Sequence, residues 1–388
     1  MRSLHVVFLE PWYGGSHRAF LDAWARRSRH RVTVHGLAPR HWKWRQEASA
    51  WELARAVDPE APPDVLACSG YVDVPRLHGF LPRGWAGRPT LVYFHETQLT
   101  YPESPASRAS APAAREGRDL THGFSNVLSA IRADRAVFNS AHHLDEFRGA
   151  ADEVLRRLPR PSPRRELSAA LERASVVPPM PELEDVPLGP GHGGPLRVAF
   201  PHRLEHDKDP EAFARAVRAA AERGARLEVE LLGGAPEKAA AVVEQLRPWV
   251  RNERFVEDRG RYLEVLGRCD VVASTALHEF FGVAFTEAMA AGCAPLAPSR
   301  LNYPSLLEPY DPGGSMAGAY ADDADLVHRL TGLALAPDRV RGPARRAAAR
   351  DAVLPLDAAG AAVALDGIVD ELGPRNWDPE NGALKTGP

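Results

Sequence analysis

The 388-residue chain is poor in cysteine and in net charge, and each shortage excludes a class of protein. Cys68, Cys269 and Cys293 are its only cysteines, they are widely spaced, and no two form a C-x-x-C pair. This excludes a disulfide framework and predicts a reducing, cytoplasmic setting. The formal net charge of -3 excludes a molecule that is basic overall. It leaves room for a local basic patch, so a nucleic-acid partner stays open.

The chain also lacks long apolar runs. No segment is expected to reach the roughly 18 to 20 apolar residues that span a bilayer, so we expect no membrane partner. The apolar run at the start, Met1–Glu10, continues into Trp12-Tyr13-Gly14-Gly15 instead of a small-residue cleavage site. We therefore expect no signal peptide.

Short apolar runs typical of buried parallel strands alternate with helical stretches in both halves of the chain. The expected strands are Leu4–Leu9, Arg31–Leu37, Asp64–Ser69, Pro89–Glu96, Ala136–Ser140, Leu196–His202, Leu227–Gly233, Asp270–Thr275 and Ala294–Ala297. Their alternation with helices predicts an α/β protein with two Rossmann-like doubly wound domains facing a cleft. Ligands of open α/β sheets bind beyond the carboxyl ends of the strands, so informative residues are expected just after strands.

A stretch rich in proline and glycine, residues 178–195, interrupts this pattern and marks the boundary between the halves. We predict an N-terminal acceptor domain over residues 1–185, a linker over 186–194 and a C-terminal nucleotide-sugar domain over 195–372. The last helical segment, Leu356–Leu372, could return to the N-terminal domain. Residues 373–388 form a polar tail that is expected to fray.

The sharpest signal in the chain is the segment 278–292, which reads HEFFGVAFTEAMAAG. It places Glu279 and Glu287 on either side of Gly282, where a helix is expected to begin directly after a strand. Gly282 lets a backbone N–H approach a phosphate, and the helix N-terminus supplies oriented donors and partial positive charge. Glu279 can accept hydrogen bonds from sugar hydroxyls, and Glu287 can bind a ribose diol. The alternative is a solvated helix with incidental glutamates.

A second signal, residues 200–210, reads FPHRLEHDKDP and follows the first strand of the C-terminal half. Arg203 and Lys208 are two cations at a strand end, which a diphosphate leaving group needs to neutralise developing charge. The alternative is a charged surface loop. His202 and His206 share i, i+4 spacing, but a metal site would need a helix here and further ligands.

Together these two segments resemble the GT4 family of retaining glycosyltransferases. The resemblance implies a GT-B fold, no metal or other cofactor, and a leaving phosphate that deprotonates the acceptor on the same face. It implies that Arg203 and Lys208 grip the pyrophosphate and that Glu287 holds the ribose. The predicted donor-binding set is Gly14, Gly15, His202, Arg203, Lys208, Gly233, Glu279, Phe280, Phe281, Gly282, Val283 and Glu287. Residues that recognise the base are expected between Gly233 and Arg261.

Residues of the N-terminal half also follow expected strands. Gly14 and Gly15 can approach the donor phosphates across the cleft, or they form a plain turn. His95, in the sequence YFHETQLTYP, can hydrogen-bond a sugar hydroxyl or orient the acceptor, or it is a satisfied structural histidine. We predict His95, Arg203, Lys208 and Glu279 as the catalytic set. Gln98, three residues after His95, is predicted to bind the acceptor.

Two further segments suggest contacts with RNA. Trp42, Trp44 and Arg45 lie in HWKWR, where aromatic rings can stack an unpaired base and cations can hold phosphates. The alternative is an amphipathic turn that packs two tryptophans. Arg156 and Arg157 begin an arginine-rich, proline-broken stretch, which is either a phosphate-binding patch or a solvated loop.

The motifs LEPWYGGSH, HWKWR, YFHETQLTYP, FNS, PHRLEHDKDPE and HEFFGVAFTEA together resemble the tRNA-queuosine mannosyltransferase family, across both halves. The resemblance implies transfer of mannose from GDP-mannose to the cyclopentene diol of queuosine in the tRNA anticodon. Thr97 and Leu204 depart from the asparagine and tryptophan usual there, which puts sugar and acceptor identity in question. Two alternatives stay open: a GT4 enzyme with a glycan, lipid or small-metabolite acceptor, or a catalytically inactive tRNA- or sugar-binding protein.

Overall fold

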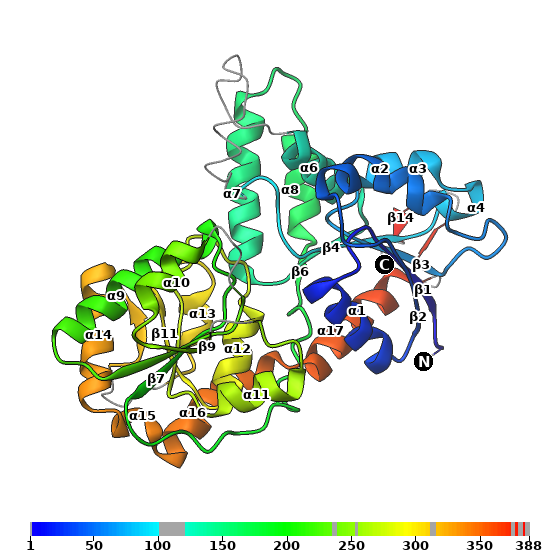
Figure 1. Ribbon diagram of the computed structural model, residues 1–388. Coiled ribbons are helices and arrows are strands. Elements are labelled where there is room, and N and C mark those ends of the chain that lie inside the picture. The colour runs from blue at the N-terminus through cyan, green and yellow to red at the C-terminus, as the bar shows by residue number, and fades with distance from the viewer. Residues whose placement is uncertain are drawn as a thin grey trace. The chain divides into compact units, whose positions relative to one another are not determined.

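The computed structural model describes residues 2–100, 121–234, 239–252, 255–310 and 316–373, together with two short strands at 377–378 and 383–384 (Figure 1). The chain forms two compact units. Unit 1 comprises residues 1–180 and 358–388, and unit 2 comprises residues 181–357. Each unit is an α/β layer structure built on a parallel sheet, so the predicted fold class is correct.

The sheet of unit 1 has the strand order β2-β1-β3-β4-β5-β6, and every neighbouring pair is parallel. The strands are β1 (His5–Glu10), β2 (Arg31–Gly36), β3 (Val65–Ser69), β4 (Thr90–Phe94), β5 (Arg135–Phe138) and β6 (Ser175–Val176). The helices are α1 (Gly15–Arg27), α2 (Trp42–Ala54), α3 (Val74–Phe80), α4 (Arg83–Ala86), α6 (Thr121–Arg132), α7 (Ala141–Arg157), α8 (Arg164–Glu172) and α17 (Ala358–Leu372). Two short antiparallel strands, β13 (Trp377–Asp378) and β14 (Ala383–Leu384), lie in the predicted tail, whose other residues beyond 373 lie outside the described part.

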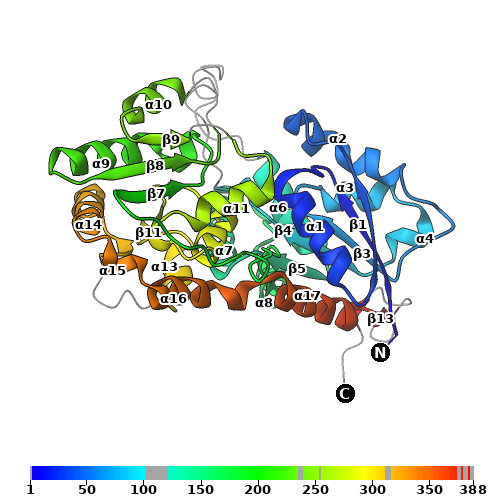
Figure 2. The ribbon, with the colours of Figure 1, turned by 60° about the horizontal axis from the view of Figure 1, so that its bottom comes forward.

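Helix α17 lies beside α1 in unit 1, although the two helices are far apart in the sequence (Figure 2). Leu365, Val369 and other apolar side chains of α17 share one core with β1, β3, β4 and α1. Asp366 is buried in this contact and accepts hydrogen bonds from the Trp24 indole at 2.9 Å and the Ser28 hydroxyl at 2.7 Å. A buried carboxylate needs such donors, so α17 is fixed to α1 by polar as well as apolar contacts.

The sheet of unit 2 has the order β12-β11-β10-β7-β8-β9, again with parallel neighbours. Its strands are β7 (Leu196–Phe200), β8 (Leu227–Leu231), β9 (Val250–Asn252), β10 (Val271–Ala273), β11 (Ala294–Pro298) and β12 (Gly318–Tyr320). Its helices are η1 (His206–Lys208), α9 (Pro210–Glu222), α10 (Ala240–Leu246), α11 (Arg259–Gly267), α12 (Val283–Ala290), α13 (Tyr303–Leu307), α14 (Asp323–Leu335), α15 (Asp338–Arg341), α16 (Pro343–Val353) and η3 (Leu354–Leu356). In unit 1 the chain crosses to the other side of β1 after β2, and in unit 2 it crosses to the other side of β7 after β9. Ligands of open α/β sheets bind beyond the carboxyl ends of the strands at such a switch point.

The predicted boundaries differ from the units. Unit 2 begins at residue 181, and the segment expected to be a linker packs against it. Leu183 and Val186 are buried in the core of unit 2. The buried Arg346 guanidinium donates to the carbonyl of Gly189 at 3.0 Å and to the carbonyls of Gly267, Cys269 and Ala291 at 2.8 to 2.9 Å. Proline and glycine make this segment extended, but Arg346 holds it in place.

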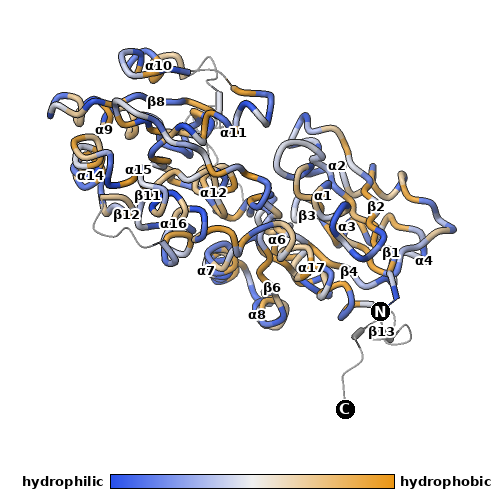
Figure 3. The backbone as a smooth tube through the Cα atoms, turned by 90° about the horizontal axis from the view of Figure 1, so that it is seen from below, coloured by the Kyte–Doolittle hydropathy of each residue, from blue (hydrophilic) through white to orange (hydrophobic). Residues whose placement is uncertain are grey.

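One stretch, Pro343–Leu372, is long and apolar enough to cross a membrane by length and composition alone, with 56% of its most apolar window buried. The expectation that no segment reaches such a length was therefore too strict. The stretch comprises α16, the 3-10 turn η3 and α17, and its buried side chains belong to the cores of the two units. In the amphipathic helix α7, polar and apolar residues follow one another along the chain (Figure 3).

Candidate active site

Lys208 is the centre of the polar cluster in unit 2. It ends the 3-10 turn η1 after β7, and its side chain is 13% exposed. The Nζ atom contacts the carbonyl oxygen of His278 at 2.7 Å, a carboxylate oxygen of Asp207 at 3.0 Å and one of Glu279 at 3.3 Å. Burial by itself lowers the pKa of Lys208, but Glu279 and Asp207 outweigh it and raise the pKa. The ammonium is therefore charged, and each of its three donors has a partner.

Glu279 connects Lys208 to the start of α12. Its Oε1 atom accepts hydrogen bonds from the backbone N–H groups of Phe280 and Phe281 at 3.1 and 3.3 Å. Burial favours the neutral carboxyl, but Lys208, His202 and the Phe281 amide outweigh it and lower the pKa of Glu279. Gly282 precedes Val283, the first residue of α12, with a left-handed φ of 97° that favours glycine. The predicted helix start is correct, and it lies beside a fixed carboxylate.

His202 and Gly233 lie behind this cluster at the ends of β7 and β8. His202 is 5% exposed, and its Nε2 atom has no hydrogen-bond partner among the described residues. Burial, with the Lys208 charge second, lowers the pKa of His202 to about 4, so the ring is neutral at pH 7. A Cβ atom at Gly233 would lie 2.2 Å from the backbone of His202. Gly233 is therefore required by the close packing of two strand ends.

Arg203, the second cation of the predicted pair, is exposed. Its side chain is 64% exposed, and Arg203 Nη2 lies 3.2 Å from Glu205 Oε2. No contact between Arg203 and Lys208 is found among the described residues. Two cations thus follow β7: Lys208, which is buried and has all its donors paired, and Arg203, which is exposed and can move.

Glu287 lies on α12, as predicted, with 8% exposure. Its Oε1 atom accepts a hydrogen bond from Arg259 at 2.8 Å, and Tyr262 also interacts with it and has its pKa raised well above the usual 10, mainly by burial. Arg259 begins α11 and is half exposed. The prediction that base-recognising residues lie between 233 and 261 named neither Arg259 nor Tyr262, because a single arginine or tyrosine at the start of a helix has no distinguishing pattern. Part of that interval, 235–238 and 253–254, lies outside the described residues.

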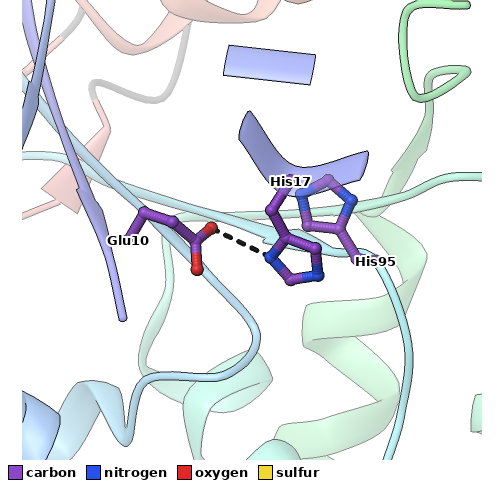
Figure 4. Close-up of side chains that lie close together, drawn as sticks. All are labelled: Glu10, His17 and His95. Carbon is purple, nitrogen blue, oxygen red and sulfur yellow. Dashed lines mark ion pairs between the residues drawn. The ribbon is translucent and has the colours of Figure 1, made fainter. Parts of the chain in front are cut away.

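Unit 1 contains a second polar cluster, made of Glu10, His17 and His95 (Figure 4). Glu10 ends β1 with no exposed surface, and its carboxylate lies 3.2 Å from the Nδ1 atom of His17 on α1. The His17 ring stacks on the ring of His95, which follows β4, with centroids 4.0 Å apart and planes at 26°. Sequence analysis selected His95 but missed Glu10 and His17.

These ring positions fit hydrogen bonding better than metal coordination. Glu10, His17 and His95 are a group of ligand-type side chains whose nearest atoms lie within 4.8 Å of one another. Histidine binds a metal ion in the plane of its ring, at about 2.0–2.1 Å for zinc. The in-plane lone pairs of two stacked, nearly parallel rings do not converge on one such point. As arranged, the cluster is a charged pair with a stacked neighbour.

A small pocket opens beside this cluster, within unit 1. It is lined by His17, Ser69, Gly70, Tyr71, His95, Glu96, Gln98 and Asn126. Asn126 fixes its walls: its side chain donates to the carbonyl of Gly70 at 2.7 Å and accepts from the backbone N–H of Gln98 at 2.8 Å. Thr97 is buried and contacts Asn126. The lining is rich in neutral donors and acceptors, which suits a hydroxyl-bearing ligand.

Gly14 and Gly15 form the entry to α1. Gly15 has a left-handed φ of 53° and no atom close to its missing side chain, whereas a Cβ atom at Gly14 would lie 2.5 Å from Pro39. The turn reading is therefore sufficient to explain Gly14. Open space beside Gly15 keeps its backbone accessible, as its predicted role requires.

Trp42 and Trp44 lie in the first turn of α2, where the alternative to base stacking was an amphipathic turn that packs both tryptophans. They are 46% and 59% exposed. Trp42 is also close to the pocket, because the Tyr71 hydroxyl donates to its carbonyl at 3.1 Å. Arg45 instead pairs with Glu52 of the same helix. The two tryptophans present ring surface to solvent beside a pocket-lining tyrosine, whereas the charge of Arg45 is already balanced.

Arg156 and Arg157 lie in the last turn of α7, on exposed positions. Each forms an i, i+4 ion pair, Arg156 with Asp152 and Arg157 with Glu153. Arg164 also reaches Asp152, at 2.7 Å. These pairs balance much of the local charge, which favours the solvated reading over a strong phosphate-binding patch.

The two units of the chain have the GT-B fold. Solved structures that cover nearly the whole chain carry the fold comparison. Anabaena HepE in complex with UDP and glucose matches with a TM-score of 0.64 at 16% identity, covering 95% of this chain and 99% of that chain. The sucrose-phosphate synthase of Thermosynechococcus elongatus matches with a TM-score of 0.67 at 14% identity, covering 96% and 99%.

Sequence comparison gives the family. The profile of the tRNA-queuosine alpha-mannosyltransferase N-terminal family matches residues 5–181, and that of family 4 glycosyltransferases in conflict systems matches residues 145–300. The Drosophila melanogaster tRNA-queuosine alpha-mannosyltransferase is 31% identical over 318 residues, which are 78% of this chain and 81% of that protein. The chain therefore belongs to the tRNA-queuosine alpha-mannosyltransferase family.

Proposed function

We propose that this glycosyltransferase moves mannose from GDP-mannose to queuosine in the tRNA anticodon, with retention of the anomeric configuration. The observation that carries the proposal is the cluster at the start of α12, where Lys208 and Glu279 meet two backbone N–H groups and Gly282. The N-terminus of a helix favours an anion, and a nearby cation stabilises a leaving diphosphate. The Drosophila relative supports the choice of sugar and acceptor.

In this proposal the residues of unit 2 bind the donor by exchanging their present hydrogen-bond and ion-pair partners for groups of the donor. Lys208 gives up one of its carboxylates for a phosphate oxygen, since its three donors are otherwise taken. Glu279 is then able to accept hydrogen bonds from sugar hydroxyls. The exposed Arg203 swings onto the diphosphate, and Glu287 binds the ribose diol while Arg259 balances its charge. These protein cations supply the positive charge, so no metal ion is required.

The acceptor binds unit 1. His95 hydrogen-bonds a hydroxyl in the pocket, and Gln98 lines the same pocket. Trp42 and Trp44 offer exposed rings on which unpaired anticodon bases can stack. We expect the enzyme to act in the cytoplasm, where its three buried, unpaired cysteines stay reduced.

The test has a binding step and a transfer step. Thermal stabilisation is compared for GDP-mannose, GDP, UDP-glucose and ADP-glucose, and GDP-mannose is expected to give the largest shift. Transfer is then followed by mass analysis of queuosine-containing tRNA, with the same tRNA carrying guanine at that position as the matched control. The proposal predicts one added hexose only on the first tRNA.

The anomeric outcome is tested on the isolated product. GDP-mannose is an α-glycoside, so retention gives a product cleaved by an α-mannosidase and resistant to a β-mannosidase. A β-linked product overturns retention. Hydrolysis of GDP-mannose without transfer to tRNA would mean a different acceptor, and binding of tRNA without turnover would mean an inactive binding protein.

A further inference from the structure

The proposed reaction assigns a role to His95 but none to the two residues beneath it. Glu10 and His17 are nearly inaccessible, at 0% and 9% exposure. Glu10 is firmly held, because its Oε1 atom accepts from the backbone N–H of Trp12 at 2.8 Å and from the Ser69 hydroxyl at 3.2 Å. A buried charged pair at the end of a strand is costly to assemble, and breaking it leaves an uncompensated charge.

We propose that Glu10 and His17 are positioning residues, whose ion pair keeps the stacked His95 ring neutral and turned toward a substrate hydroxyl in the pocket of unit 1. The inference rests on the proposed function, in which His95 meets the acceptor. It adds two residues to the site, of which His17 also lines the pocket. Their effect is exerted through His95.

The contacts around His95 fix the position of its ring. His95 is held from several sides: it stacks on His17, its ring meets Phe20 edge-on at 4.9 Å, and its carbonyl accepts from Asn139 at 2.8 Å. Its Nε2 atom is buried and has no hydrogen-bond partner among the described residues. A buried, unpaired ring nitrogen beside a polar pocket is costly unless a ligand satisfies it.

The charged groups around His17 and His95 decide which of the two rings is favoured to carry a proton. The charged or titratable groups that face the two rings are Glu10 from β1, Glu96 after β4 and His143 from α7. Burial lowers the pKa of His17, but Glu10 and Glu96 outweigh it and raise the pKa, which favours the protonated form of this ring. Burial, His17 and His143 hold the pKa of His95 well below its usual range.

The chemistry follows from these charges. A neutral imidazole has one donor and one acceptor nitrogen, so it can hydrogen-bond a neutral hydroxyl in either direction. An imidazolium could only donate. The Glu10 carboxylate lies 3.2 Å from His17 Nδ1 and favours the protonated form of His17, which leaves His95 as the neutral member of the stack.

The first test uses the unaltered full-length protein and does not depend on activity. Histidine is labelled with ¹⁵N, ring signals are followed from pH 5 to 9, and the two signals are assigned by their loss in His17→Gln and His95→Gln. At pH 7 we expect His17 to be protonated and His95 to be neutral. A neutral His17 or a protonated His95 at pH 7 overturns the proposal.

The second test uses pH profiles of kcat/KM for queuosine-containing tRNA. In His17→Gln the cation is lost while Glu10 lies within 4.8 Å of His95, so His95 takes up the proton. We expect kcat/KM of this variant to fall about 10-fold between pH 8 and pH 6, against less than about 2-fold in the wild type. The double variant Glu10→Gln/His17→Gln has no buried charge, and we expect it to regain the flat profile.

A structural role alone predicts a different result. It would lower kcat/KM equally at every pH in both variants, which would overturn the proposal. His142→Gln is the matched control, because it removes another histidine that pairs with a glutamate, Glu146, on α7. If the wild type fails to modify tRNA, the proposed function fails, and the ring titration still decides the protonation states.

Discussion

Each unit presents a carboxylate paired with a base just beyond the strands of its sheet, but the bases differ. In unit 2 Glu279 is paired with a lysine, whose charge persists across the physiological pH range because its pKa is raised further. In unit 1 Glu10 is paired with a histidine, a side chain that loses its proton at a lower pH than lysine does. The comparison suggests a fixed grip on an anion in unit 2 and a charge distribution sensitive to pH in unit 1.

The strongest way to break the comparison is Lys208→Ala. We expect kcat/KM to fall by at least about 1,000-fold, because the diphosphate loses its buried cation. Asp207 and Glu279 are left uncompensated, so unit 2 is expected to lose about 3 kcal/mol of stability as well. Transfer assays and urea unfolding measure the two effects.

Lys208→Arg, which keeps the charge, is the control for the loss of cation. Lys208→Ala/Glu279→Gln is the control for folding, because it removes one of the two carboxylates that lose their cation. Normal turnover of GDP-mannose by a folded Lys208→Ala protein would show that the donor site has been assigned to the wrong residues.

The next effect concerns pH and stability in unit 2. The pKa of His202 is about 4 in the folded protein and 6.5 as its ordinary value. Between these values the unfolded chain binds a proton that the folded chain does not, so stability falls as the pH falls. The expected loss from this residue is about 2 kcal/mol at pH 5. Urea unfolding at pH 7 and pH 5 should show that His202→Gln loses less stability than the wild type. Equal losses in both proteins would contradict the buried neutral ring.

Glu287→Gln sharpens the role of α12. We expect KM for the donor to rise about 10- to 100-fold with kcat little changed, because hydrogen bonds from the ribose diol to a charged group are weakened. Steady-state kinetics with varied donor measures this. Glu264→Gln on the exposed face of α11 is the matched control and is expected to behave as the wild type. A fall in kcat alone would place Glu287 outside the ribose site.

Trp42→Ala tests whether the aromatic surface beside the unit 1 pocket binds RNA. Losing one stacked base should raise KM for tRNA about 10-fold and leave binding of the donor unchanged. Trp51→Ala is a close control, because Trp51 is equally exposed, at 46%, on the same helix. If both variants lose tRNA affinity equally, the effect belongs to the whole helix and not to the end near Tyr71.

The smallest effect is expected from the double variant Arg156→Gln/Arg157→Gln. Both arginines are already paired with carboxylates of α7, so KM for tRNA should change less than about 2-fold. Binding is measured at several salt concentrations. A lower slope of affinity against salt would instead identify these side chains as phosphate contacts.

Local patterns explain which of these features the sequence could predict. Strands and helix starts follow from apolar runs and glycine, and Glu279, Gly282 and Glu287 lie within one continuous segment. The Glu10–His17–His95 cluster needed the register of β1, α1 and β4, which no local pattern contains. The packing of residues 186–194 is hidden from local patterns for a similar reason, because the contact between Arg346 and Gly189 joins residues 157 positions apart.

The return of α17 to unit 1 has a consequence for synthesis on the ribosome. Asp366, whose carboxylate accepts hydrogen bonds from Trp24 and Ser28, is synthesised about 340 residues after them. Unit 2 is continuous in the chain and can complete its core before residues 358–372 emerge. Until those residues are synthesised, the apolar face of α1 in unit 1 stays uncovered. We therefore expect a stalled or shortened chain to lose the fold of unit 1 and to keep the fold of unit 2.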